Sequence, residues 1–211
     1  MTFNLPNLIT AARVALTPVI AVLLFQQNSG LRLLAFLLFL GAAVSDLWDG
    51  HVARQRGQVT TFGKMVDPIA DKLLLLASLI PLYVLTGGDS RLAGLPVFER
   101  IPLWAVLILL GREALITTLR LTAARRGAVV AARRLGKRKA VAQNIFLGSG
   151  ILWVSLRTAD LGSVDGGFWG AFRAFHGWFT AVFLILALAL TVISMAAYLF
   201  AFGRIFARRA S

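Results

Sequence analysis

The chain has no cysteine and little charge of either sign. Asp, Glu, Lys and Arg make up only 15% of its 211 residues, whereas 58% are hydrophobic. Without cysteine, structural disulfides and thiolate metal sites are excluded, and so apolar a composition excludes an ordinary soluble domain. The mean hydropathy of +0.79 instead indicates a protein whose surface faces lipid.

Acidic residues are scarce, and they are unevenly placed. The sequence has nine in all, and four of them, Asp46, Asp49, Asp67 and Asp71, lie within one short segment. Ionisable groups in membrane-spanning sequence are costly and mark places where something is bound or moved. This segment is therefore the first candidate for a functional site.

Long apolar runs predict an all-α integral membrane protein with one domain over residues 1–211. A spanning helix needs about 20 mostly apolar residues. No signal-peptide pattern precedes the first run, which we interpret as a retained helix. Six runs qualify: 8–26, 31–55, 66–86, 101–124, 139–158 and 173–202.

The basic residues predict how these helices are oriented. Lys and Arg gather at 54–72, at 120–139 and after 202, whereas the opposite connections hold only Arg32, Arg91, Arg100, Arg157 and Arg173. Cytoplasmic loops carry the excess of positive charge, so both termini and the aspartate segment are predicted at the cytoplasmic face of the cell inner membrane. The net charge of +13 is thus explained by anionic lipid and anionic substrates better than by nucleic acid.

The spacing of the four aspartates predicts two facing pairs. Asp46 and Asp49 are i and i+3, and Asp67 and Asp71 are i and i+4, so each pair lies on one helical face. If the chain folds back between them, the pairs converge at the membrane boundary, where carboxylates repel unless they are protonated or bind cations. Oxygen ligands suit Mg²⁺, Mn²⁺ or Ca²⁺. The alternative is a set of interfacial ion pairs with Arg54, Lys64 and Lys72.

The residues between the aspartates extend this pattern. The pattern Asp46-x2-Asp49-Gly50-x2-Ala53-Arg54-x8-Gly63-x3-Asp67-x3-Asp71 resembles the motif of the CDP-alcohol phosphatidyltransferases. The resemblance implies that the four aspartates hold two divalent cations, Mg²⁺ or Mn²⁺, with Asp71 also acting as general base. It implies a pocket for CDP-diacylglycerol formed by Gly50, Ala53, Arg54, Gly63 and Thr60.

Other segments resemble the branch of this family that makes phosphatidylglycerophosphate. These are 4–13, where Asn7 and Thr10 would lie near the nucleotide, 111–120 and 136–143. The resemblance implies phosphatidyl transfer to glycerol 3-phosphate with release of CMP, in a homodimer. Arg112 and Arg120 are eight residues apart and so share a helix face. With Lys137 and Lys139 they are predicted to bind the acceptor phosphate.

Several alternatives stay open at this point. Other members of the family use inositol phosphate, phosphatidylglycerol or serine as the acceptor. A cation or proton transporter would also need buried aspartates, but such sites usually lie at the membrane midplane between repeated halves, and no repeat is evident here. A non-catalytic lipid-binding protein would not need the complete motif.

Overall fold

The computed structural model of the protein describes residues 5–55, 61–125, 134–159 and 167–210. Side chains within these ranges are described except at 5–7, 46–55, 61–65, 134 and 204–210. The described chain forms six helices, which confirms the helix count predicted from the apolar runs. They are α1 (Leu5–Phe25), α2 (Ser29–Gln55), α3 (Thr61–Gly88), α4 (Leu103–Arg125), α5 (Arg134–Thr158) and α6 (Gly167–Ala210).

Three of these helices contain stretches long and apolar enough to cross a membrane. The stretches are Leu8–Phe25 in α1, Val66–Gly88 in α3 and Gly167–Gly203 in α6, and α2 contains the shorter apolar stretch Ser29–Ser45. Helices α4 and α5 are less apolar because their sequences include charged and amide side chains. The molecule is an all-helical membrane protein.

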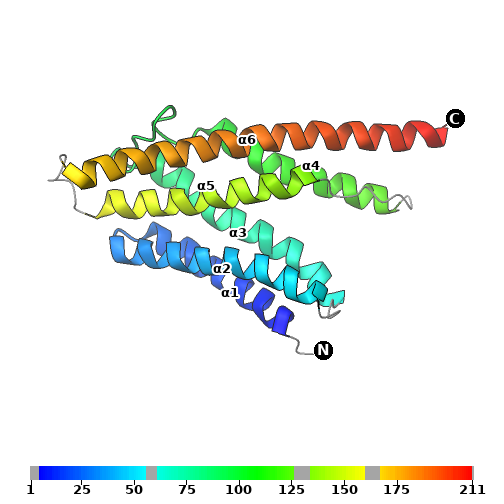
Figure 1. Cartoon of the computed structure of the whole chain (residues 1–211), viewed down its shortest axis with the longest axis horizontal. Helices are drawn as coiled ribbons and strands as arrows, with labels where there is room; N and C mark the ends of the chain where they lie inside the picture. The colour runs from blue at the N-terminus through cyan, green and yellow to red at the C-terminus, as the bar shows by residue number, and fades with distance from the viewer. Residues whose placement is uncertain (1–4, 56–60, 126–133, 160–166, 211) are drawn as a thin grey trace.

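The helices run back and forth so that alternate connections lie at the same end. Figure 1 shows the starts of α1, α3 and α5 and the ends of α2, α4 and α6 toward one end of the molecule. α5 packs against α6, α2 and α3, whereas α1 packs against α2 and α3, and α4 against α3 and α6. The helix ends near the aspartate motif and near the basic 120–139 segment are therefore on the same side.

Glycines on α5 allow its close approach to two neighbouring helices. A Cβ at Gly148 would lie 3.3 Å from the Phe39 ring, and one at Gly150 would lie 3.0 Å from Leu82. Small residues bring helices together in membrane proteins in this way. The result is a shared core around α5, which includes Phe39, Leu82 and the fully buried Phe146.

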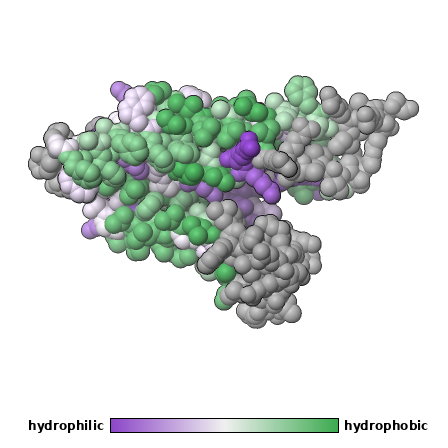
Figure 2. Space-filling view, viewed as in Figure 1, coloured by the Kyte–Doolittle hydropathy of each residue, from purple (hydrophilic) through white to green (hydrophobic). Residues whose placement is uncertain are grey.

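Apolar side chains also cover much of the outer surface. Leu107, Phe175 and Phe200 are each more than half exposed, and Figure 2 shows broad apolar areas on the described part of one face, with hydrophilic side chains gathered toward the middle. Lipid, not water, is the solvent that suits such a surface.

Three of the five cations predicted in the outer connections lie inside helices: Arg32 in α2, Arg157 in α5 and Arg173 in α6. Arg32 lies inside α2 and is only 4% exposed. Its Nε donates to the Leu24 carbonyl at 3.1 Å and its guanidinium also donates to the Thr158 hydroxyl. The last carbonyls of a helix lack intrahelical partners, so Arg32 caps the end of α1 and ties it to the end of α5. Arg32 therefore belongs to the start of a helix, as the predicted run 31–55 already implies, and not to the connection before it.

Candidate functional site

The second aspartate pair lies on one face of α3, as its spacing predicts. Asp67 and Asp71 both line a cavity of about 570 Å³, which is enclosed by α3, α4 and α5 with Ala43 of α2 at its edge. The Asp71 side chain is 56% exposed, so its carboxylate is accessible to a molecule in the cavity. Pro68 follows Asp67 within the helix and cannot donate a backbone hydrogen bond, which leaves this turn of α3 less tightly bonded.

Two buried side chains of α1 donate hydrogen bonds to the two carboxylates. Thr10 donates its hydroxyl to Oδ1 of Asp67 at 2.7 Å, and Arg13 donates from Nη1 to Oδ1 of Asp71 at 3.1 Å. Thr10 and Arg13 are each 2% exposed. They are i and i+3 on α1, so they share a face, just as their partners do on α3. The packing of α1 on α3 therefore orients both aspartates.

Arg13 was not predicted as a site residue. It ends the segment 4–13 that resembles the family, but no role was assigned to it, although a cation inside the apolar stretch Leu8–Phe25 is itself a signal. Thr10 was predicted to lie near the nucleotide. The structure places its hydroxyl on Asp67, which makes it a positioning residue for a carboxylate.

The predicted metal site is described only in part. Asp67 and Asp71 are in place, but the side chains of Asp46 and Asp49 lie outside the described ones. Among described residues no group of three or more His, Cys, Asp or Glu comes together. Two carboxylates one helical turn apart, which line a cavity and accept hydrogen bonds from buried side chains of α1, fit a hard divalent cation. Ala43 lines the same cavity, and Asp46 follows it by one turn of α2.

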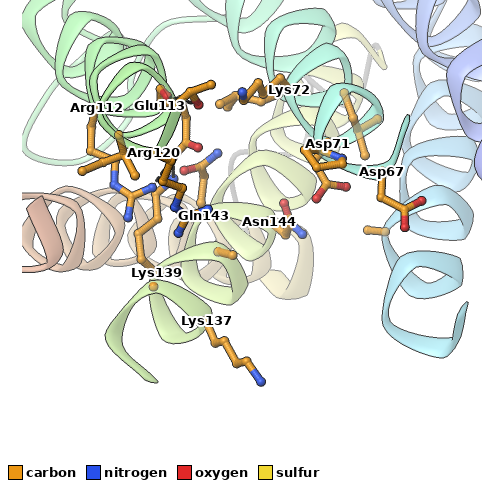
Figure 3. Close-up of a pocket in the computed structure, with 18 of the residues that line it drawn as sticks. Asp67, Asp71, Lys72, Arg112, Glu113, Arg120, Lys137, Lys139, Gln143 and Asn144 are labelled. Carbon is orange, nitrogen blue, oxygen red and sulfur yellow. Dashed lines mark hydrogen bonds and ion pairs between the residues drawn. The ribbon is translucent and has the colours of Figure 1, made fainter. Parts of the chain in front are cut away.

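The opposite wall of the cavity is basic. Arg112, Arg120, Lys137 and Lys139 all line it, so the structure brings the four predicted acceptor-binding residues into the same space as the aspartates. In Figure 3, Arg112, Arg120 and Lys139 lie across the cavity from Asp67 and Asp71. Their role in binding stays a prediction.

Glu113 ties two of these cations together, and it was missed in the sequence. Its Oε1 accepts from Lys139 Nζ at 2.5 Å and from Arg112 Nη1 at 2.8 Å. Lys139 is only 3% exposed, and a buried ammonium needs such a partner. Glu113 thus fixes both side chains while leaving the wall with more positive than negative charge.

Helix α6 supports the arginines from outside the cavity. Ser194 accepts from Arg112 Nη2 at 3.4 Å, and the guanidinium carbon of Arg120 lies 5.8 Å from the centre of the Tyr198 ring. A guanidinium at this distance from an aromatic face gains a cation–π attraction. These contacts link α6 to the site.

Two amide side chains lie between the carboxylates and the cations. Gln143 and Asn144 line the cavity, and both are drawn between Lys139 and Asp71 in Figure 3. Gln143 is one turn after Lys139 on α5 and is 6% exposed, and its Oε1 has no hydrogen-bond partner among the described residues. Neither residue was singled out from the sequence as a site residue.

The remaining predicted site residues fall outside the described side chains. Helices α1 to α3 contain most of these positions, but the structure gives no contacts for them. They are Asn7, Asp46, Asp49, Gly50, Ala53, Arg54, Thr60 and Gly63, of which Thr60 lies in the undescribed segment 56–60.

The carboxylates on one wall of the cavity and the cations on the opposite wall define which kind of molecule can bind between them. A small molecule with a phosphate at one end and a hydroxyl at the other would place the phosphate on the basic wall and the hydroxyl near Asp71. A carboxylate at hydrogen-bonding distance from a hydroxyl can act as its general base. The cavity therefore suits activation of a phosphorylated alcohol.

Comparison with known proteins agrees with this geometry. The family model described as CDP-alcohol phosphatidyltransferase matches residues 3–201. The chain is 39% identical over 155 residues to the Bacillus subtilis CDP-diacylglycerol–glycerol-3-phosphate 3-phosphatidyltransferase, covering 68% of this chain and 74% of that protein. It is 38% identical over 161 residues to the Rickettsia typhi protein of the same name, covering 72% and 83%.

A third relative carries a related name. The probable phosphatidylglycerophosphate synthase of Mycobacterium tuberculosis strain CDC 1551 is 37% identical over 155 residues, covering 72% of this chain and 68% of that protein. The matched family segment includes all four motif aspartates and the whole cavity. The chain belongs to the CDP-alcohol phosphatidyltransferase family.

Proposed function

We propose that the protein transfers the phosphatidyl group of CDP-diacylglycerol to glycerol 3-phosphate, giving phosphatidylglycerophosphate and CMP. The observation that carries the proposal is the cavity that Asp67 and Asp71 share with Arg112, Arg120, Lys137 and Lys139, with Lys72 also in its lining. Relatives whose names state this reaction, at 37–39% identity, support the same acceptor. No comparable support exists for inositol phosphate, phosphatidylglycerol or serine, or for a transporter.

The basic wall would hold the phosphate of the acceptor. Arg112, Arg120, Lys137 and Lys139 supply more positive charge than Glu113 offsets, and the guanidinium groups can bind phosphate oxygens in a bidentate manner. Serine carries no phosphate and would leave this wall without a partner. An acceptor bound here is oriented with its free hydroxyl toward α3.

Asp71 would take the proton of that hydroxyl as its oxygen attacks phosphorus. A new P–O bond forms between the acceptor oxygen and the phosphorus that carries diacylglycerol, and the P–O bond to the CMP phosphate breaks, so CMP leaves with the bonding electrons. Arg13 holds Asp71 in position for this step. An alcohol is a weak nucleophile near neutral pH, and a positioned base is worth about 10²- to 10⁴-fold in rate.

Divalent cations would be held by Asp46, Asp49, Asp67 and Asp71, and when bound they would neutralise charge on the pyrophosphate of the donor. Asn7, Gly50, Ala53, Arg54, Thr60 and Gly63 would form the donor pocket, with Thr10 at its edge through Asp67. The position of Ala43 on the cavity wall, one turn before Asp46, supports the placement of the first pair beside the second.

The membrane arrangement follows from the same reasoning. We propose six spanning helices, both termini and the site at the cytoplasmic boundary, and residence in the inner membrane. Support comes from the helix ends beside the aspartate motif and beside the basic 120–139 segment, which lie toward one end of the molecule (Figure 1). The homodimer stays a prediction, which light scattering of the detergent-solubilised protein tests.

An acceptor panel tests the proposal. Purified protein in detergent with CDP-diacylglycerol and Mg²⁺ or Mn²⁺ is given glycerol 3-phosphate, inositol phosphate, serine or phosphatidylglycerol, and CMP release is measured. Release with glycerol 3-phosphate alone is expected. Release only with another acceptor would keep the family and overturn the acceptor, and no release with any would overturn the enzyme assignment.

A further inference from the structure

The amide oxygen of Gln143 is an unusual atom in this cavity. It is a strong hydrogen-bond acceptor, its side chain is 6% exposed, and no described residue donates to it. A buried polar group without a partner costs about 1–3 kcal/mol, so such groups are rare unless a ligand or water completes them. Because Gln143 lines the cavity, the missing donor is expected to come from a molecule bound there.

Two cations that line the same cavity donate to other side chains, although the Nε of Arg112 is itself buried without a partner among the described residues. Lys139, one turn before Gln143 on the same face of α5, gives its Nζ to Glu113, and Arg112 donates to Glu113 and Ser194. These contacts keep the Lys139 ammonium on a carboxylate and the two Nη atoms of Arg112 on a carboxylate and a hydroxyl. None of the three donates to the Gln143 oxygen.

Its position along the cavity indicates which donor. Figure 3 shows Gln143 between the cation wall of Arg112 and Lys139 and the carboxylate of Asp71. If the phosphate of a short acceptor lies on the cations and its reacting hydroxyl faces Asp71, the part of the acceptor that passes Gln143 is its middle. In glycerol 3-phosphate the middle carbon carries a hydroxyl that takes no part in the transfer.

We propose that Gln143 Oε1 accepts a hydrogen bond from this middle, non-reacting hydroxyl and so makes the site selective for a phosphorylated glycerol over a phosphorylated simple alcohol. The inference rests on the proposed function. Sites that hydrogen-bond a substrate hydroxyl reject analogues that lack it, because the protein group is then left buried and unpaired.

The test compares glycerol 3-phosphate with 3-hydroxypropyl phosphate, which keeps the phosphate and the reacting hydroxyl and lacks only the middle one. Wild-type enzyme is expected to show a kcat/KM at least about tenfold lower with the analogue. In Gln143→Met, which keeps length and volume but has no strong acceptor, the two acceptors are expected to agree within roughly twofold. The loss falls on glycerol 3-phosphate, while the analogue is used at nearly its wild-type rate.

Two further variants make the test specific. Gln143→Glu keeps an acceptor oxygen and is expected to keep the discrimination, even if its charge lowers the rate with both acceptors. Val141→Ala lies on the exposed side of α5, away from the cavity, and is expected to behave as wild type. Activity of Gln143→Met with the analogue is itself the control for folding.

Three outcomes would overturn the inference. The first is an equal kcat/KM of the wild type with both acceptors, a result that does not depend on the folding of any variant. The second is a Gln143→Met variant that discriminates between the acceptors as strongly as the wild type does. The third is a Gln143→Met variant whose kcat/KM falls equally with both acceptors. The failure of the proposed function looks different, since wild-type enzyme would then release no CMP with either acceptor.

Discussion

Arg13 of α1 donates from Nη1 to Oδ1 of Asp71 on α3 at 3.1 Å, and the two side chains differ sharply in exposure, 2% for the arginine and 56% for the aspartate. The cation is buried behind the site and the carboxylate opens into the cavity. An arginine in the first membrane helix thus aims the residue that we assign as the general base.

Replacing Arg13 is therefore expected to reduce kcat more than it raises the KM of either substrate. Arg13→Met removes the group that orients Asp71, and misplacement of a catalytic group by about 1 Å can cost about 10²-fold in rate. Arg13→Lys is expected to recover little, because an ammonium does not reproduce guanidinium geometry. Arg138→Met serves as the control, since Arg138 is exposed and does not line the cavity. A wild-type kcat in Arg13→Met would contradict the positioning role.

Thr10→Val is expected to weaken metal dependence. The hydroxyl that donates to Asp67 is lost while the shape is kept, and loss of a partner that orients a metal ligand typically costs 10–100-fold in metal affinity. The Mg²⁺ concentration for half-maximal rate should rise by about tenfold, and Thr10→Ser should restore it. Thr17→Val, whose hydroxyl bonds only the Arg13 carbonyl in the contacts seen here, is the matched control. A change in the KM of CDP-diacylglycerol with unchanged Mg²⁺ dependence would instead favour direct nucleotide contact by Thr10.

Glu113→Gln is expected to lower stability. Lys139 is 3% exposed, and it would lose the charged partner that compensates its burial. Breaking a buried ion pair by removing one partner costs about 3–5 kcal/mol. Adding Lys139→Met to Glu113→Gln should recover part of this loss, which a double-mutant cycle on thermal unfolding in detergent measures. Additive effects of the two changes would show that the pair is not coupled.

Tyr198 tests the contribution of α6. Its hydroxyl is buried without a partner among the described residues, so Tyr198→Phe should be close to neutral. Tyr198→Leu removes the ring beneath Arg120, and the KM for glycerol 3-phosphate should rise about two- to fivefold, as a cation–π contact of about 0.5–1 kcal/mol implies. Equal KM values for the Phe and Leu variants would contradict a role of the Tyr198 ring in positioning Arg120.

Much of this site could be predicted from the sequence, because the face on which a helical residue lies depends only on its spacing from nearby residues in the same helix. The spacing of Asp67 and Asp71 predicts their common face, and the spacing of Arg112 and Arg120 predicts theirs. The six apolar runs predict six helices, although helix ends moved by several residues. α6 begins at Gly167 and not at 173, because the glycine- and aromatic-containing stretch 167–172 continues the helix.

The partners of these residues could not be predicted in the same way. Arg13 and Asp71 are 58 residues apart, and Glu113 and Lys139 are 26 apart. Periodicity says which side of a helix a residue occupies, but not which helix packs on that side. Gln143 carries no charge and breaks no pattern, so only its unpaired oxygen in the packed structure marks it.

The central claim is that Asp71 activates glycerol 3-phosphate for attack on CDP-diacylglycerol. The most direct measurement is the formation of phosphatidylglycerophosphate and CMP by wild type and by Asp71→Asn, followed by mass spectrometry in detergent with Mg²⁺. We predict equal amounts of both products from the wild type and neither from a folded Asp71→Asn. Turnover by Asp71→Asn at the wild-type rate, or CMP without the lipid product, would contradict the account.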